Sequence, residues 1–198
     1  MEDNEIIRGI NQSFLKLLNQ KAYEAISVQE IAQEAFISRA TFYIYFKNKD
    51  AILVGLLDDF LNEFDLLQKE NTDFLNHVDM TDPTSIKNIL YPNTIKIIQY
   101  FYENKNLITV LIGSNSNINF MRVLQQVYYN HFINALPQMF YKELSSDILE
   151  YYALFMTNGV AAIVESWINE GFKTSVEIIS NKILNILASS LQSIYTDL

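Results

Sequence analysis

Residues 27–50 read SVQEIAQEAFISRATFYIYFKNKD. The stretch opens with Ser27 and has Glu30 three positions later, which is the pattern of a capping box at the start of a helix. That helix ends three residues before a second helical segment, residues 39–45, for which Ser38 is a natural N-cap. Two short helices joined by so short a turn predict a helix-turn-helix.

Helical periodicity continues on both sides of this pair. Residues 5–20 carry an amphipathic pattern, and Asn48 is a natural N-cap for a long helix over about residues 48–70. Each pattern has one apolar stripe, which predicts the face that the helix buries. The stripes consist of Ile6, Ile7, Ile10, Phe14, Leu17 and Leu18 upstream, and of Ile52, Leu53, Leu56, Leu57, Phe60, Phe64 and Leu67 downstream.

The first 55 or so residues resemble the DNA-binding head of the tetracycline-repressor (TetR, AcrR-like) family of bacterial transcriptional regulators. The resemblance is carried by Ile-Ala-x-x-Ala at 31–35, Ser-Arg-x-Thr-Phe-Tyr-x-Tyr-Phe at 38–46 and Lys-Asp at 49–50. One position departs from the pattern, because Phe36 stands where many members have Gly. A left-handed backbone at this turn carries a steric penalty for Phe that Gly escapes.

The resemblance implies an all-α protein of about nine helices. A helix-turn-helix DNA-binding domain is expected at residues 1–48, and a helical effector-binding and dimerisation domain at 49–198. The implied function is a ligand-responsive transcriptional regulator, a repressor that binds a palindromic double-stranded DNA operator as a homodimer and is released by a small-molecule effector. Two-fold heads would match half-sites roughly 34–36 Å apart. Activation in place of repression stays open.

The second helix of a helix-turn-helix lies in the major groove with its N-terminal residues at base edges. Arg39 can therefore bind guanine O6 and N7, and the hydroxyl or methyl group of Thr41 can meet a base edge or a thymine methyl. Tyr43 and Tyr45 are two positions apart, so they flank the helix and are expected to reach phosphates. We predict a DNA-contacting set of Ser27, Ser38, Arg39, Ala40, Thr41, Tyr43, Tyr45, Lys47 and Lys49.

Other residues of this head have expected positions as well. Phe42 and Phe46 are four apart, share one helix face and are expected to point into the core. Lys49, at a helix N-terminus, is expected to hold a phosphate, and Lys47 is similar. Ser27 either contacts a phosphate or serves only as a helix cap.

Composition supports the same class. The chain has 198 residues, 49% of them hydrophobic, with 13 Phe and 12 Tyr, so it is too apolar for a disordered chain. Only 5 Gly and 3 Pro favour helices over short strands. No Cys and two distant His argue against disulfides, a metal site and a His-based catalytic triad, and we expect neither an enzyme nor a cofactor.

The net charge of −9 lies mainly outside the head. Residues 1–50 have six Lys and Arg against seven Asp and Glu, whereas residues 51–198 have eight against sixteen. Residues 35–49 carry Arg39 and two Lys without an acidic residue, so a polyanion can dock there. Because no apolar run approaches the roughly 18 residues of a membrane span and the N-terminus lacks a signal-peptide pattern, we expect a cytoplasmic protein without a membrane partner.

Beyond the head, caps and helix breakers predict further helices. One is expected from Asp82-Pro83 to a break at 113–117, kinked or restarted at Pro92. The next are expected at about 118–136, ended or kinked near Pro137, and at 147–170, with Gly171 at its C′ position. A capping box at Thr174–Glu177 opens the last helix.

This second region is rich in aromatic residues, more than plain packing requires, and apolar pockets between helices are where ligands bind. The resemblance implies an effector pocket here and a dimer interface on the last two helices. The candidate pocket residues are Phe101, Phe120, Met121, Tyr128, His131, Phe155, Asn158 and Trp167. The alternative is a DNA-binding regulator or co-activator whose second region docks a partner protein. An enclosed cavity favours a sensor, and an exposed apolar patch well above about 400 Å² favours a partner.

Overall fold

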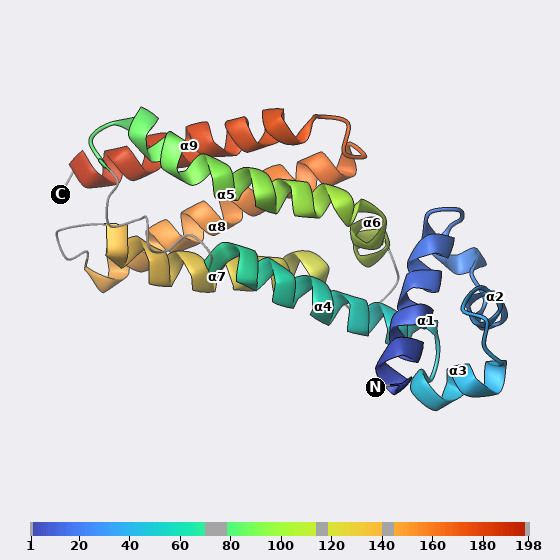
Figure 1. The fold of residues 1–198 in the computed structure, drawn as a ribbon. Coiled ribbons are helices and arrows are strands. Elements are labelled where there is room, and N and C mark those ends of the chain that lie inside the picture. The colour runs from blue at the N-terminus through green and yellow to red at the C-terminus, as the bar shows by residue number, and fades with distance from the viewer. Residues whose placement is uncertain (1, 70–78, 114–118, 140–144, 197–198) are drawn as a thin grey trace. The chain divides into compact units, whose positions relative to one another are not determined.

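The computed structural model describes residues 2–69, 79–113, 119–139 and 145–196. All regular structure in these ranges is helical, which confirms the all-α prediction (Figure 1). In order, the helices are α1 (Glu2–Leu18), the short 3₁₀ helix η1 (Tyr23–Ala25), α2 (Val28–Glu34), α3 (Arg39–Tyr45), α4 (Lys49–Lys69), α5 (Pro83–Glu103), α6 (Lys105–Gly113), α7 (Phe120–Met139), α8 (Ser146–Asn169) and α9 (Val176–Thr196).

The chain forms two compact units. The first comprises residues 1–60 and 104–119, and the second comprises residues 61–103 and 120–198. The division falls inside α4, which therefore contributes residues to both units. The domain boundary predicted after residue 48 lies at the N-terminus of this helix.

The first unit has a core made by the apolar stripes of its helices. Backbone contacts join α1 to α2, α2 to α3 and α1 to α6. The upstream stripe is buried from Ile10 to Leu18, and Phe42 of α3 is fully buried. The small side chain of Ala32 is also buried, as close packing of α2 requires.

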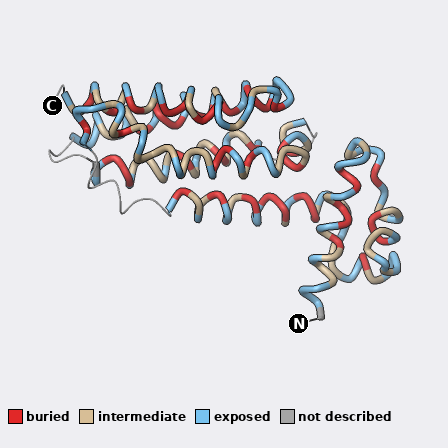
Figure 2. Tube along the Cα trace, turned by 45° about the horizontal axis from the view of Figure 1, so that its top comes forward, coloured by how far each residue is buried: buried red, intermediate tan, exposed pale blue. Residues whose placement is uncertain are grey.

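The second unit is built from two helix pairs. α5 packs along α9, and α7 packs along α8. Figure 2 shows that buried residues recur along these helices between exposed ones, as amphipathic helices require. The largest fully buried side chains of this unit are Phe64, Phe101, Phe120 and Trp167.

Helix ends follow the predicted caps in most places. Asp82 caps α5, where its carboxylate accepts hydrogen bonds from the backbone of Thr84 at 3.0 Å and Ser85 at 3.1 Å. Gly171 ends α8 with φ of 72°, as predicted for a C′ residue. The capping box of α9 was assigned one residue too early: α9 begins at Val176, so Ser175 is the cap.

One break differs from the prediction, and both prolines lie inside helices. α5 continues through Pro92 to Glu103, and α7 continues through Pro137 to Met139. A proline removes one N–H and crowds the preceding turn, and packing against neighbouring helices outweighs that local cost here. The chain instead breaks at Asn104, between α5 and α6, where no proline or glycine stands. α6 ends at Gly113, and residues 114–118 of the predicted loop lie outside the described residues.

Candidate nucleic-acid interface and ligand cavity

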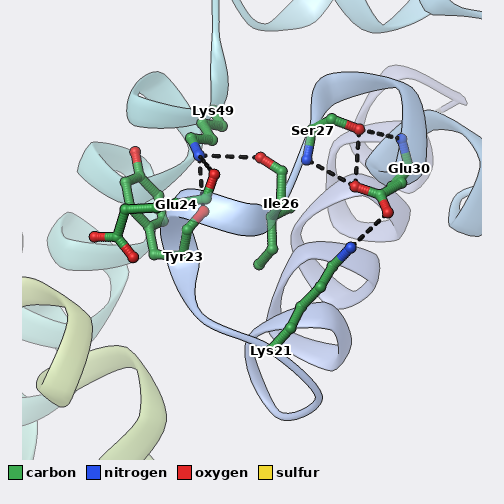
Figure 3. A network of polar contacts seen from close by, with 7 residues as sticks. All are labelled: Lys21, Tyr23, Glu24, Ile26, Ser27, Glu30 and Lys49. Carbon is green, nitrogen blue, oxygen red and sulfur yellow. Dashed lines mark hydrogen bonds and ion pairs between the residues drawn. The ribbon is translucent and has the colours of Figure 1, made fainter.

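The capping box predicted at Ser27 and Glu30 is present at the start of α2. The Ser27 hydroxyl oxygen accepts a hydrogen bond from the Glu30 backbone N–H at 3.2 Å, and the Glu30 carboxylate accepts one from the Ser27 N–H at 2.9 Å. Lys21 forms an ion pair with the same carboxylate (Figure 3). The Ser27 hydroxyl also donates to the Glu30 carboxylate at 2.8 Å. The Lys21 ammonium, the Ser27 N–H and the Ser27 hydroxyl together lower the pKa of Glu30 to about 2. The Ser27 hydroxyl therefore caps α2. A phosphate contact by Ser27 stays a prediction.

The turn between α2 and α3 has the left-handed residue that the sequence analysis anticipated. Phe36 has φ of 56°, and its ring is 95% exposed. Its N–H donates to the Gln33 carbonyl at 3.1 Å, and the Ile37 N–H donates to the Ala32 carbonyl at 2.9 Å. This pair of bonds is the Schellman motif, which usually places Gly where Phe36 stands.

α3 is capped by Ser38, whose hydroxyl oxygen accepts a hydrogen bond from the Thr41 N–H at 2.9 Å. The two hydroxyl groups of Ser38 and Thr41 are also within 2.8 Å of each other. Phe42 is fully buried, and its ring centroid lies 6.0 Å from that of Phe46, which confirms the inward face. The Thr41 hydroxyl therefore already has partners within the helix turn.

The opposite side of α3 is exposed. Arg39, Ala40 and Tyr43 of the predicted set lie there, and Lys47 follows the helix and is exposed too. Ile44 is 75% exposed on this side and is not among the predicted DNA contacts. Its signal was available, because residues 40, 43 and 44 share one helix face, and an apolar side chain on that face has no core to pack against. An apolar group at this position can meet a thymine methyl.

Tyr45 and Lys49 have protein partners in the structure. The Tyr45 hydroxyl donates to the Asp3 carboxylate at 2.6 Å. The Lys49 ammonium donates to the backbone carbonyl oxygens of Tyr23 at 2.7 Å and Ile26 at 3.0 Å, and it lies 4.2 Å from the centre of the Tyr23 ring (Figure 3). A third carbonyl, that of Glu24, is 3.5 Å away. The phosphate contact predicted for Lys49 would have to compete with these bonds.

The second unit contains a partly open cavity of about 100 Å³ between α4, α5, α7, α8 and α9. Most of its lining is apolar, and the polar members come from α4, α5 and α7. The apolar lining residues are Leu90, Ile97, Ile98, Phe132, Val160, Ile183 and Leu187, and the polar ones are Gln68, Asn93, Thr94, Tyr128 and His131.

Two of the eight predicted pocket residues, Tyr128 and His131, line this cavity. Phe101, Phe120 and Met121 belong to the packing of the second unit, with the Phe101 ring centroid 5.5 Å from that of Phe64.

The other three predicted residues belong to α8 and lie away from the cavity. Phe155 is 57% exposed, and Asn158 is exposed with its amide donating to the Leu154 carbonyl at 2.8 Å. Trp167 is buried at the end of α8, where its ring centroid lies 4.9 Å from that of Phe172 and its Nε1–H donates to the Thr174 carbonyl at 2.7 Å. Phe155 and Asn158 therefore lie on the surface of α8, and Trp167 packs at the C-terminal end of this helix.

Gln68 and Asn93 are the polar lining residues that sequence reasoning missed. Gln68 is 1% exposed, and neither its Nε2 nor its Oε1 has a hydrogen-bond partner among the described residues. The Oδ1 of Asn93 likewise has none within the described part of the chain. The signal was a polar residue in an apolar register, because Gln68 follows Phe60 and Phe64 at four-residue spacing.

Burial shifts the titration of the other polar lining residues. It raises the pKa of Tyr128 above its usual range and lowers that of His131, which the nearby Asp65 carboxylate opposes. The His131 imidazole is therefore neutral at pH 7. Over the described ranges, we find no group of three or more His, Cys, Asp or Glu placed to hold a metal ion, and none of the described helices is long and apolar enough to span a membrane.

Two family models match the chain. One, described as bacterial regulatory proteins of the tetR family, matches residues 15–56, and the other, described as a transcriptional regulator C-terminal region, matches residues 88–189. The uncharacterized HTH-type transcriptional regulator YxbF of Bacillus subtilis is 23% identical over 179 residues, which make up 90% of this chain and 44% of YxbF. The chain spans less than half the length of the curated relatives it matches.

Solved structures show the same fold. The dihydroxyacetone kinase operon activator DhaS matches with a TM-score of 0.70 and 22% identity, over 96% of this chain and 97% of DhaS. The transcriptional regulator FadR from Bacillus subtilis, solved in complex with stearoyl-CoA, matches with a TM-score of 0.60 and 18% identity, over 92% of this chain and 97% of FadR. At these identities the likeness concerns the fold alone.

Proposed function

Because this chain belongs to the TetR family of bacterial transcriptional regulators, we propose that it binds a palindromic operator as a homodimer, represses transcription from it and is released by a small-molecule effector. The observation that carries the proposal is the combination of a capped helix-turn-helix in one unit with a mostly apolar cavity in the other. We also place the protein in the cytoplasm, where such an operator is found.

The exposed side of α3 supports DNA reading. Arg39 stands at the N-terminal end of this helix, the end that faces base edges in a helix-turn-helix. Ala40, Tyr43 and Ile44 extend the same side, and Lys47 supplies a positive charge for a phosphate. Since the Thr41 and Ser38 hydroxyls bond to each other and Lys49 bonds to backbone carbonyls, we assign base reading to Arg39 first and phosphate contact to Lys47 first.

A homodimer is supported by exposed apolar residues on the last two helices. Tyr151 and Phe155 of α8 are 72% and 57% exposed, and Ile178 and Ile186 of α9 are 51% and 50% exposed. Large apolar side chains gathered on exposed helix faces are typical of an interface with another chain. A second copy of the chain is the occupant that a palindromic operator requires, because a two-fold protein matches a two-fold site.

We assign to α4 the step by which effector binding releases the protein from DNA. This helix carries Lys49 in the first unit and Gln68 at the cavity of the second. A ligand that fits the cavity better in one arrangement of α4 shifts the population toward that arrangement, and only this difference in affinity can change DNA binding. The apolar cavity with its few polar groups supports this sensor role, and docking of a partner protein is the alternative.

The test is selection of bound sequences from a random DNA duplex pool at about 150 mM salt, which screens much of the non-specific attraction. We expect a palindrome. On that operator, Arg39→Ala should weaken binding by about 1–3 kcal/mol and relax the base preference at one position of each half-site.

Lys47→Ala is the matched control, since it removes an exposed charge near the same helix. We expect it to weaken binding to operator and random DNA by the same factor and to reduce the salt dependence. Equal losses on operator and random DNA for Arg39→Ala would contradict the base-reading assignment. Failure to recover any motif with a folded dimer would contradict the proposed operator binding.

A further inference from the structure

We propose that the cavity binds a small uncharged molecule with an apolar body and one polar group that both donates and accepts a hydrogen bond, held by the side-chain amides of Gln68 and Asn93. The inference rests on the proposed function in taking this cavity as the effector site. It goes further by giving the chemical class of the effector.

The amide groups provide the first argument. Gln68 is 1% exposed, yet its donor and its acceptor both lack a hydrogen-bond partner among the described residues, and so does the Asn93 acceptor. A buried polar group left unpaired costs about 1–3 kcal/mol. Both residues line the cavity, so a molecule inside it can supply the missing partners. Because a primary amide presents N–H and C=O side by side, its best partner also has a donor next to an acceptor.

The charge of the lining provides the second argument. Of the described residues, those that line the cavity include no Asp, Glu, Lys or Arg, and burial keeps the His131 imidazole neutral. A charged ligand here would lose its hydration without gaining a counter-charge, which is strongly unfavourable. The occupant is therefore uncharged.

The size of the cavity provides the third argument. Its volume is about 100 Å³, whereas an engineered apolar cavity of about 150 Å³ holds benzene. The space suits a molecule of about six non-hydrogen atoms at most, with the seven apolar lining residues around its body. Stearoyl-CoA, the ligand in the FadR structure, is far larger and carries phosphates, so it does not fit this lining.

A pair of ring compounds of equal size tests the polar requirement. 2-Pyrrolidone has an N–H beside its C=O, whereas cyclopentanone has the C=O alone. We would titrate each into the isotope-labelled full-length protein, without DNA, up to about 50 mM, because fragments of this size bind in the millimolar range. Methyl resonances of Ile97 and Ile183, which line the cavity, report binding at this site.

We expect both methyl groups to shift with 2-pyrrolidone, and we expect it to bind about tenfold more tightly than cyclopentanone, the value of one additional good hydrogen bond. Gln68→Met preserves the length of the side chain and removes both polar atoms. It should abolish the tenfold preference and leave the melting temperature of the free protein unchanged or higher, because an unpaired buried amide is gone. Gln99→Met, the same change at an exposed position of α5, should retain the preference.

The inference is overturned by no shift of the Ile97 and Ile183 methyls, by equal affinities for the two compounds, or by a preference that survives in Gln68→Met. Tighter binding of a charged ring, protonated pyrrolidine, also overturns it. None of these measurements involves DNA. The inference can therefore fail while operator binding stands, and operator binding can fail while the ligand preference stands.

Discussion

Phe36 and Phe172 share a backbone conformation that residues with a Cβ rarely adopt. Their φ angles are 56° and 58°. Each follows the end of a helix, but the surroundings differ. The Phe36 ring is 95% exposed, whereas Phe172 is 8% exposed with its ring against Trp167. Packing of the Phe172 ring therefore offsets the backbone strain at that residue. The exposed Phe36 ring gives no such compensation.

Replacing each of these residues with glycine should have opposite effects. Phe36→Gly relieves about 1–2 kcal/mol of strain and loses about 0.4–1 kcal/mol through the greater entropy of the unfolded chain, so we expect a gain of up to about 1.5 kcal/mol. Phe172→Gly also removes a buried ring and should lower the free energy of unfolding by about 2–4 kcal/mol. Hydrogen exchange of the α2 and α3 amides measures the first change, and urea unfolding followed by Trp167 fluorescence measures the second.

Phe36→Ala is the control for the exposed site, because alanine removes the ring and keeps the Cβ. We expect it to leave the stability of the first unit close to that of the unchanged protein. If Phe36→Ala stabilises the unit as much as Phe36→Gly does, loss of the exposed ring explains the gain and backbone strain does not.

At the scale of elements, Lys49 connects the start of α4 to η1 by hydrogen bonds. Its ammonium donates to the carbonyls of Tyr23 and Ile26 at the end of this short helix, and the Tyr23 carbonyl also accepts a hydrogen bond from the Ile26 N–H. The Tyr23 hydroxyl in turn donates to the carboxylate of Asp50, the next residue of α4. One lysine thus links two helical elements that are separated by the helix-turn-helix.

Lys49→Met should lower the stability of the first unit by about 1–3 kcal/mol, because the carbonyls lose a charged donor. Lys47→Met, two residues away and exposed, should leave stability unchanged and weaken DNA binding. Amide hydrogen exchange measures the stability, and operator titration measures the affinity. The phosphate role first predicted for Lys49 would be supported instead if Lys49→Met left exchange unchanged and weakened binding to all DNA alike.

Sequence reasoning located most helices because their signals are local. The capping box at Ser27 and the C′ glycine at 171 each act within one turn of helix, so a short stretch of sequence suffices to recognise them. The break at Asn104 depends on packing against other helices, which no local pattern contains. Prediction therefore succeeded for caps and periodicity and was wrong where tertiary packing outweighed a local preference.

The same contrast between local signals and tertiary packing explains which residues of the candidate sites could be predicted. Arg39 is exposed as expected, because a cap and a periodicity fix which side of a short helix is free. The cavity is assembled from five helices, and aromatic residues alone do not reveal which of them face it. Gln68 was a better indicator than Trp167, because an amide in an apolar stripe needs a partner whereas a tryptophan in one needs only packing.

At the scale of the whole molecule, the proposed dimer makes a prediction about assembly. Phe155→Glu places a charge in the exposed apolar surface of α8 and should convert the protein to a monomer in sedimentation experiments, since an unpaired charge in an interface is costly. Loss of the dimer should in turn weaken binding to the palindrome far more than binding to one half-site.

Leu66→Glu is the matched control, because Leu66 and Phe155 are both 57% exposed and Leu66 belongs to α4. We expect this variant to remain a dimer with unchanged operator affinity. A Phe155→Glu protein that still sediments as a dimer would show that α8 does not form the interface.

The division of α4 between the two units also affects how the protein unfolds. Residues 49–60 of this helix pack in the first unit and residues 61–69 in the second. Helices shorter than about 12–15 residues are marginal in water without packing. When one unit unfolds, its part of α4 loses support and the remaining part becomes a short helix with a frayed end. The free energies of unfolding of the two units are therefore coupled through a single helix, and a thermal scan should show overlapping transitions.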